Sequence, residues 1–379
     1  MKKQILFLFS LLPIILLAQL DVKVMDADQL RSLNIPAPYV NPVGKVLISS
    51  DFDESHKNSN QVSLDPPELE GWPLLGIVNT TGRGSRFIDI DLDGEKEIII
   101  GTGNVVRVFT PAGEVKPGWP VTLGSYGVEG APSVGNIDDD PELEIMVHTT
   151  LSGVKGELYA IDHDGTIKPN FPIFWPDGGP QKEPLLENID EDPELEIFSA
   201  VYNWPECYVY AHNGDGTLDE YWQEKVLDYI PGSGCSSGDL NGDGVPEIIA
   251  CSFWKLYAFT IKGQLLEGFP FTFDQDIQSV SYSNPVIADI DEDGFNEIVV
   301  ATCNQQPITD AGAVYVINND GSLVDGWPQF VLRWIYAPVT VADIDQDSHL
   351  DILVGDQVLS PIPDDYMHAW DKDGNSLPG

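Results

Sequence analysis

A nine-residue acidic pattern occurs six times in this sequence. Each copy carries Asp, Asn or Glu at positions 1, 3, 5 and 9, and an isoleucine follows position 9 every time. The copies are numbered here as loops 1 to 6. Loop by loop, the side chains at these four positions are Asp89, Asp91, Asp93 and Glu97; Asn136, Asp138, Asp140 and Glu144; Asn188, Asp190, Asp192 and Glu196; Asp239, Asn241, Asp243 and Glu247; Asp289, Asp291, Asp293 and Glu297; and Asp343, Asp345, Asp347 and Asp351.

Oxygen-bearing side chains at this spacing suit a hard divalent cation. Calcium takes about six to eight oxygen ligands, and such a loop can supply them together with a backbone carbonyl and water. The alternative is a turn of solvated acids, but up to five like charges within nine residues repel one another when no cation is present. The pattern therefore predicts several calcium sites, with these side chains as ligands.

The loops differ in the residue at position 6, which determines the backbone conformation of the turn. Loops 1, 4 and 5 have glycine there, loop 6 has Ser348, and loops 2 and 3 have Pro141 and Pro193. Proline fixes φ at a negative value, so the turn of loops 2 and 3 must differ from that of the glycine loops. For these two loops both calcium binding and a solvated turn stay open.

An EF-hand is the obvious competing interpretation, because loop 4 begins like an EF-hand loop. That motif needs a glutamate at position 12 and flanking helices. Position 12 of the six loops holds Ile100, Val147, Ser199, Ala250, Val300 and Val354. The EF-hand is therefore excluded.

The loops start 47 to 54 residues apart, and other landmarks keep the same phase. Each loop leads into an apolar, strand-like run and then into a second run that ends near a turn glycine. These glycines are Gly113, Gly165, Gly216, Gly263, Gly321 and Gly374. Six residues after the first five glycines stands an aromatic residue, expected in the core like the earlier Trp72: Trp119, Phe171, Trp222, Phe269 and Trp327.

About 50 residues with three or four short antiparallel strands is the size of one propeller blade. The repeat predicts an all-β fold over residues 68–379, a β-propeller of about six to seven four-stranded blades with calcium-binding loops. An array of β-sandwiches is the alternative. The next corner aromatic would fall just past Gly379. We therefore expect the propeller to be incomplete at its C-terminus, with closure of six blades through a shared strand as the alternative.

The N-terminus has the features of an export signal. Two lysines precede an apolar run from Ile5 to Leu17, which is too short to span a bilayer comfortably and ends at Ala18. Residues 1–18 are predicted to be a signal peptide and residues 19–67 a leader or linker. The mature chain is then secreted or held at the cell surface, where its four cysteines (Cys207, Cys235, Cys251 and Cys303) either form disulfides or stay as buried thiols.

The charge of the chain excludes some partners. Asp and Glu number 61 against 19 Lys and Arg, a formal net charge of −42, so the chain cannot capture nucleic-acid phosphates electrostatically. Of these 61 acids, 27 lie in the six loops. No segment after the signal is apolar enough for membrane insertion. With 42% hydrophobic residues, the chain can still bury a large core.

The Asp-x-Asp-x-Asp-Gly-x-x-Glu-Ile loop, on a period of about 50 residues, resembles the FG-GAP repeats of integrin alpha chains and the related bacterial VCBS repeats. The resemblance covers roughly residues 71–379. It implies a secreted, bladed propeller of the bacterial type, with calcium held at positions 1, 3, 5 and 9 of each loop. It also implies a role in adhesion or glycan binding.

No catalytic pattern stands out from the repeat. The six histidines show no zinc-protease spacing, and no nucleophile elbow, P-loop or dinucleotide fingerprint occurs. We therefore expect a binding or adhesion module for an extracellular protein or glycan, and no enzyme. The alternative is a lyase-like polysaccharide-degrading enzyme, or the non-catalytic propeller of a larger secreted enzyme. The oligomeric state is not predicted.

Five aromatic residues do not follow the repeat phase, and sugar rings could stack on them. Ordinary packing between blades is the alternative role. These candidate ligand residues are Trp204, Trp254, Trp334, Tyr282 and Tyr336.

Overall fold

The structure is a computed structural model, which describes residues 84–379 apart from short gaps. The gaps are 152–153, 181, 191, 204–205, 223–224, 229–230, 274–278, 281–283, 304–311, 332–334, 336, 357–366 and 379. The chain divides into two units, Met1–Pro67 and Glu68–Gly379, and the described residues all belong to the second. The signal peptide, the leader and Trp72 lie outside the described residues and stay predictions.

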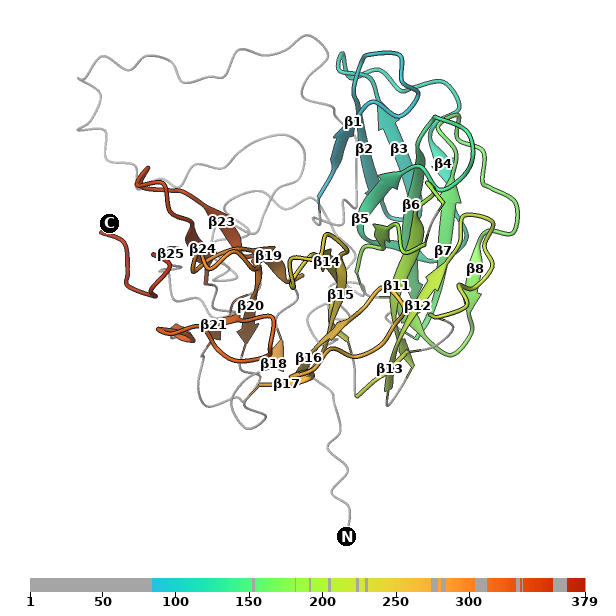
Figure 1. The fold of residues 1–379 in the computed structure, drawn as a ribbon. Coiled ribbons are helices and arrows are strands. Elements are labelled where there is room, and N and C mark those ends of the chain that lie inside the picture. The colour runs from blue at the N-terminus through green and yellow to red at the C-terminus, as the bar shows by residue number, and fades with distance from the viewer. Residues whose placement is uncertain are drawn as a thin grey trace, which may run out of the picture. The chain divides into compact units, whose positions relative to one another are not determined.

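The described residues contain no helix and form six antiparallel sheets, which follow one another in chain order (Figure 1). Sheet 1 contains β1 (Arg86–Ile88), β2 (Glu97–Thr102), β3 (Val105–Phe109) and β4 (Val121–Thr122). Sheet 2 contains β5 (Gly127–Gly135), β6 (Glu144–Leu151), β7 (Lys155–Ile161) and β8 (Ile173–Trp175). Sheet 3 contains β9 (Gly179–Pro180), β10 (Leu185–Glu187), β11 (Glu196–Asn203), β12 (Glu206–His212) and β13 (Lys225–Leu227).

The remaining sheets repeat this order. Sheet 4 contains β14 (Pro231–Gly238), β15 (Glu247–Ser252), β16 (Lys255–Phe259) and β17 (Phe271–Thr272). Sheet 5 contains β18 (Ser279–Val280), β19 (Val286–Ala288), β20 (Glu297–Cys303), β21 (Gly312–Ile317) and β22 (Gln329–Val331). Sheet 6 contains β23 (Thr340–Ala342), β24 (Asp351–Gly355) and β25 (Met367–Trp370).

Sheets 1, 2 and 4 have the predicted four strands, and sheets 3 and 5 have five because two short segments share the first position. In sheet 3 both β9 and β10 pair with β11, and in sheet 5 both β18 and β19 pair with β20. Sheet 6 has three strands among the described residues. In sheets 2 and 4 the first strand is continuous but carries an irregularity in its register. The first strand is thus the least regular part of the repeat.

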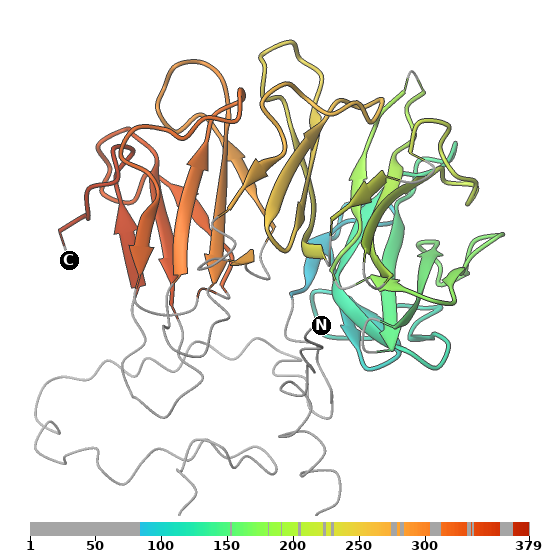
Figure 2. The ribbon, with the colours of Figure 1, turned by 90° about the horizontal axis from the view of Figure 1, so that it is seen from below.

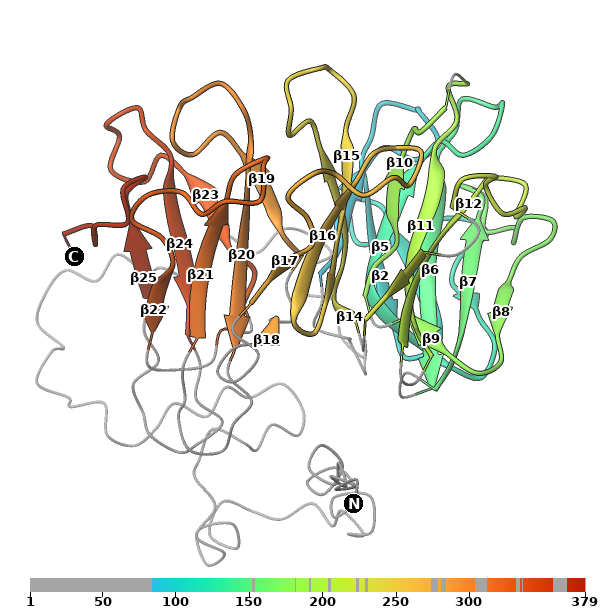
Figure 3. The ribbon, with the colours of Figure 1, turned by 60° about the horizontal axis from the view of Figure 1, so that its bottom comes forward.

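The hydrophobic core lies between successive sheets. Five clusters of buried side chains are present among the described residues, and each draws its members from two neighbouring sheets. Second strands such as β15 and β20 are buried along their whole length, which explains why they are continuous apolar runs. First strands of neighbouring sheets also contact one another, from β1 with β5 to β19 with β23. Figure 3 shows the sheets side by side in this order.

The corner aromatics belong to this core, as the sequence predicts for Trp119, Trp222 and Trp327. Their exposed fractions are 7%, 0% and 6%. Each indole Nε1 donates to a backbone oxygen in the turn of the next sheet, at 2.6 to 3.1 Å. Gly118, just before Trp119, has a φ of 88° and lies so close to that turn that a Cβ would come within 1.9 Å of the carbonyl oxygen of Asp164.

The sheets have the arrangement of propeller blades but are not closed into a ring (Figure 2). The all-β fold of repeated antiparallel sheets is therefore confirmed, whereas a closed propeller is not seen. Five interface clusters join six sheets as a series with two ends. All four cysteines are buried and free, so of the two alternatives the structure has the buried thiols. Among the described residues, no helix could cross a membrane.

Candidate metal centres

Each acidic loop joins the first strand of its sheet to the second. Position 9 is the first residue of the second strand in every sheet, from Glu97 at the start of β2 to Asp351 at the start of β24. Because the connection is the same throughout, the six loops lie at the equivalent end of each sheet. The apolar run that follows position 9 enters the core and so fixes where this acid stands.

The position 9 carboxylate is buried in all six loops, with an exposed fraction of 0–3%. One of its oxygens accepts a hydrogen bond from the backbone N–H of position 2 in the same loop. The donors are Ile90, Ile137, Ile189, Leu240, Ile290 and Ile344, at 2.7 to 3.0 Å. This acid therefore closes the loop as a structural element and has its second oxygen left for another partner.

Positions 1 and 6 explain the two kinds of loop. In loop 1, Asp89 accepts hydrogen bonds from the backbone N–H of Asp93 and Gly94, at 3.1 and 2.9 Å. Proline has no N–H, so an aspartate at position 1 of loops 2 and 3 would lose a donor. Both loops have asparagine instead, and the Nδ2 of Asn136 donates to the backbone oxygen of Asp140 at 2.6 Å. The same bond joins Asn188 to Asp192.

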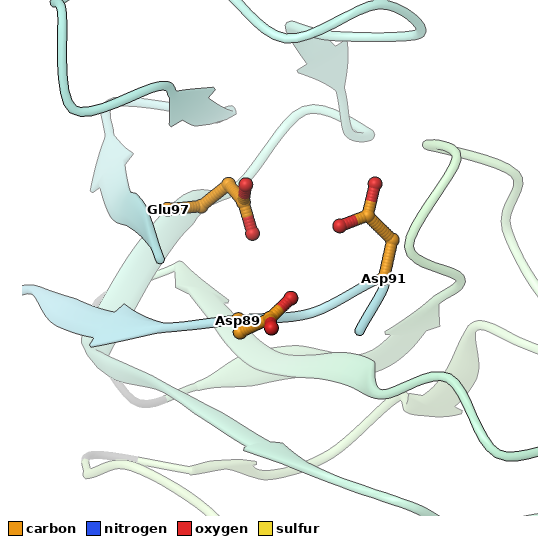
Figure 4. A group of neighbouring side chains, drawn as sticks. All are labelled: Asp89, Asp91 and Glu97. Carbon is orange, nitrogen blue, oxygen red and sulfur yellow. The ribbon is translucent and has the colours of Figure 1, made fainter. Parts of the chain in front are cut away.

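Five of the loops bring three carboxylates within 4.8 Å of one another. Positions 1, 3 and 9 converge in loops 1 and 5, positions 3, 5 and 9 in loops 2 and 3, and positions 1, 3 and 5 in loop 6. Figure 4 shows how Asp89, Asp91 and Glu97 point toward one another in loop 1. In loop 4 the amide of Asn241 donates to Glu247 at 2.8 Å.

The position 5 acids outside these clusters have a turn function. Asp93 accepts the N–H of Glu95 and Asp293 that of Phe295, at 2.8 and 2.9 Å. An acid that bonds the N–H two residues further on stabilises a tight turn without a metal.

Burial makes these clusters electrostatically costly. It raises the pKa of Glu144, Glu196 and Glu297 to about 7, against the lowering effect of the hydrogen bond from position 2. Within the acidic loops, four carboxylate oxygens are buried without a hydrogen-bond partner in the described structure: Asp91 Oδ1, Asp140 Oδ1, Glu144 Oε1 and Asp289 Oδ1. A buried carboxylate oxygen needs a donor or a cation. The donor set therefore fits a hard divalent ion.

Two lysines that the sequence analysis did not single out reach into loops 1 and 2. Lys116 Nζ lies 2.7 Å from Asp91 Oδ2 and 2.9 Å from Glu97 Oε1. Lys168 Nζ pairs with Asp138 and lies 3.8 Å from Glu144 Oε1. Burial disfavours the charge on both ammonium groups, but the carboxylates outweigh this and raise the pKa of each. Both lysines stand three residues after the turn glycine, a repeat position that the loop pattern does not include.

A cavity of about 540 Å³ lies along the first strands of sheets 1 to 5 and is the second candidate site. Much of its polar lining is already engaged between sheets. Asn284 donates to Glu183 at 3.0 Å, Ser236 to the backbone oxygen of Pro285 at 2.8 Å, and Ser237 to Glu187 at 2.5 Å. The two serine bonds join neighbouring sheets and the Asn284 bond joins sheet 5 to sheet 3, so these groups hold the sheets together, and we place the main candidate function in the acidic loops.

Of the five aromatic candidates, Trp254 alone lies within the described residues. It is half-buried, and its ring meets the edge of Phe253 at 5.2 Å. Trp204, Trp334, Tyr282 and Tyr336 are outside them. The structure shows another group, in which Trp175 of β8 stacks on Tyr210 of β12 at 6.3 Å, and Tyr210 on Tyr208 at 6.1 Å.

This group, the aromatic row, is half-buried. Alternation along β12 puts Tyr208 and Tyr210 on one face, which is the signal in the sequence that could have found them.

Comparison with known proteins identifies the repeat. A family model described as an FG-GAP-like repeat matches residues 188–250 and 289–354, which contain loops 3 to 6. The chain therefore carries FG-GAP-like repeats, as the resemblance predicts. A search of curated protein sequences finds no match.

Solved structures resemble the fold at low sequence identity. A europium-containing methanol dehydrogenase has a TM-score of 0.51 at 12% identity, over 79% of this chain and 68% of that one. The C-terminal domain of Pseudomonas aeruginosa PilY1 has a TM-score of 0.50 at 10% identity, over 74% and 79%. The V. cholerae biofilm matrix protein Bap1 has a TM-score of 0.47 at 18% identity, over 66% of this chain and 39% of that one. The first two likenesses show the fold alone.

Proposed function

We propose that this protein is an extracellular, calcium-binding repeat protein that presents its sheets as a binding surface for a glycan or protein. The observation that carries the calcium part is the group of buried carboxylate oxygens without a hydrogen-bond donor in loops 1, 2 and 5. FG-GAP-like repeats in the chain support it. The predicted signal peptide supports export.

Calcium would act here as a structural ion. In loop 5 the side chains that would hold it are Asp289, Asp291 and Glu297, which come from the turn and from the start of β20. A divalent ion offsets like charges that otherwise repel one another at this distance. The loop would then fix the first strand against the second, which positions the surface that the sheets present.

Calorimetric titration and thermal unfolding test the calcium part. The chain, freed of calcium by EDTA, should take up several calcium ions, and its melting temperature should rise when calcium is restored, because an ion that binds only the folded state stabilises it. Magnesium at equal concentration is the control, since it demands a smaller, octahedral shell. Equal melting temperatures in EDTA and calcium would contradict the proposal.

The aromatic row is the part of the described surface that best fits a glycan. Its rings are half-buried and stack on one another, and the part of each ring that stays exposed suits the apolar face of a sugar. Glycan-array binding should fall when Trp175 is changed to Ala. The variant changes only the aromatic row and keeps the buried corner aromatic Trp222. If no glycan binds, and a protein is captured in a pull-down by the wild type but not by the Trp175 variant, the ligand is a protein. Depolymerisation of a bound glycan would instead favour the enzyme alternative.

A further inference from the structure

The residue three positions after the turn glycine occupies the same place in every repeat. Its backbone N–H donates to a carbonyl of the third strand at 2.9 to 3.1 Å in all six sheets. These residues are Lys116, Lys168, Asp219, Leu266, Val324 and Leu377. Because the backbone is held in the same way, the side chains at this position, called the facing position, can be compared directly.

Lysine at the facing position reaches the acids of its own loop. The ammonium of Lys116 bridges position 3 and position 9 of loop 1, and that of Lys168 approaches the same two positions of loop 2. Both lysine side chains are only 12% exposed, so they are held in the structure and do not extend into solvent. Each ammonium thus contacts the oxygens that the cluster would offer to a metal ion.

Loops 2 and 3 form a natural matched pair. Their nine residues differ at one position, Asp139 against Glu191, and both have asparagine first and proline sixth. Their facing residues have opposite charge, since Lys168 faces loop 2 and Asp219 faces loop 3. The charge at the facing position is therefore a clear difference between two loops of nearly identical sequence.

We propose that Lys116 and Lys168 act as built-in cations for loops 1 and 2, so that these loops take up calcium far less readily than loop 3. This inference rests on the proposed calcium binding of the repeat. Calcium binds oxygen at 2.3–2.6 Å, and the ammonium already lies 2.7 and 2.9 Å from two of the oxygens in loop 1. The ammonium already occupies one oxygen of Asp91 and one of Glu97, and its positive charge repels a second cation beside it, so calcium has to compete with the lysine for this cluster. The facing residue thus sets the calcium affinity of each loop.

Hydrogen exchange during a calcium titration of the full chain reads the loops separately. Peptides covering β6 report loop 2, and peptides covering β11 report loop 3. In the wild-type chain, protection of β11 should appear at a calcium concentration at least about tenfold lower than protection of β6. Lys168→Leu should bring the β6 midpoint close to that of β11, since leucine stands naturally at the facing position in sheets 4 and 6.

Two further variants complete the experiment. Lys116→Leu should lower the calcium midpoint of β2 in the same way, and it replaces Lys168→Leu if that variant does not fold. Lys255→Leu is the matched control, because Lys255 pairs with Asp228 at the opposite end of β15 from loop 4. It should leave every midpoint unchanged.

The outcomes separate the two proposals. Equal wild-type midpoints for β6 and β11, or a β6 midpoint that Lys168→Leu leaves unchanged, would overturn the role of the lysines while calcium binding stands. If no strand responds to calcium, calcium binding itself is overturned and the inference with it. An early β11 response and a β6 response shifted by Lys168→Leu would support both.

Discussion

The position 9 acid combines two roles in one side chain. It accepts the N–H of position 2 through one oxygen and presents the other to the loop, and it is buried while doing so. Glutamine can keep the first role, because an amide oxygen also accepts a hydrogen bond, but it cannot supply the charge. The two roles can therefore be separated by one substitution.

The effect of Glu196→Gln on the free energy of unfolding should be opposite in the absence and in the presence of calcium. In EDTA at pH 8 the variant should be more stable than the wild type by about 2 kcal/mol in the free energy of unfolding, because it removes a buried charge whose pKa is raised to about 7. In calcium it should be less stable, because a ligand is lost. Urea unfolding in both conditions measures this. Glu267→Gln, at an exposed position, is the control and should change stability little in either condition. Destabilisation of the protein by Glu196→Gln in EDTA would contradict the prediction.

His148 should make stability depend on pH. Its Nδ1 bonds the backbone oxygen of Lys182 at 2.6 Å and its Nε2 bonds Ser199 Oγ at 2.9 Å. Burial lowers its pKa to about 4, with His212 as a nearby like charge when protonated. The unfolded state therefore binds more protons below about pH 6.5, and stability falls as the pH drops from there toward 4.

The loss attributable to His148 should be about 3 kcal/mol by pH 4. Urea unfolding from pH 4 to 7 in EDTA, compared between the wild type and His148→Gln, isolates it from the carboxyl groups, which titrate in both proteins. The difference in unfolding free energy between the two should shrink as the pH falls. A constant difference would show that the histidine does not titrate on unfolding.

At the scale of the element, the loop is a unit whose residues depend on one another. Asparagine at position 1 and proline at position 6 occur together in loops 2 and 3, and the hydrogen bonds show why. In loops 1, 4 and 6 the aspartate accepts the N–H groups of positions 5 and 6, whereas the asparagine of loop 2 bonds a carbonyl. Substitutions at these two positions should therefore not be additive.

A double-mutant cycle in loop 2 tests this dependence. Asn136→Asp alone leaves the new carboxylate without a donor at position 6, and Pro141→Gly alone adds backbone freedom without a new bond. Both should destabilise the protein. The double variant should recover at least about 1 kcal/mol of the summed loss, because it recreates the pairing of loop 1. Strictly additive effects in urea unfolding would contradict the prediction.

The features of the fold and the site that recur at constant spacing in the sequence could be predicted from it, and the others could not. Position 9 and the corner aromatics, such as Trp222, recur at constant spacing, so their phase alone predicts the second strand and the core. Lys116 is 19 residues from Glu97, and the residue type at this facing position differs from repeat to repeat. No spacing rule therefore predicts that the two side chains meet. The first strand carries bulges and breaks that depend on contacts between sheets, which local pattern does not encode.

At the scale of the whole molecule, the net charge of −42 acts on a series of sheets whose hydrophobic core clusters each join two neighbours. Repulsion among the loops accumulates along such a series, since 27 acids lie at one end of the sheets. A bound ion and added salt relieve the same repulsion, one locally and one by screening.

Salt should therefore stabilise the calcium-free chain more than the calcium-bound one. Raising sodium chloride from about 0.05 to 0.5 M shortens the screening length to a few ångströms, which weakens repulsion between loop acids. The rise in melting temperature should be several degrees in EDTA and clearly smaller in calcium. Potassium chloride in place of sodium chloride controls for ion-specific effects. Equal shifts in both conditions would show that the loops contribute little repulsion.

The two facing lysines lie in the N-terminal sheets, which has a consequence for the order in which the sheets fold. Sheets 1 and 2 carry their own cations, whereas sheets 3 to 6 have none at the facing position. On the proposed export from a calcium-poor to a calcium-rich compartment, the N-terminal sheets would reach their folded form first and offer an ordered edge. The later sheets would then assemble onto that edge when calcium binds their loops, so folding would proceed from the N-terminal sheets toward the C-terminal ones.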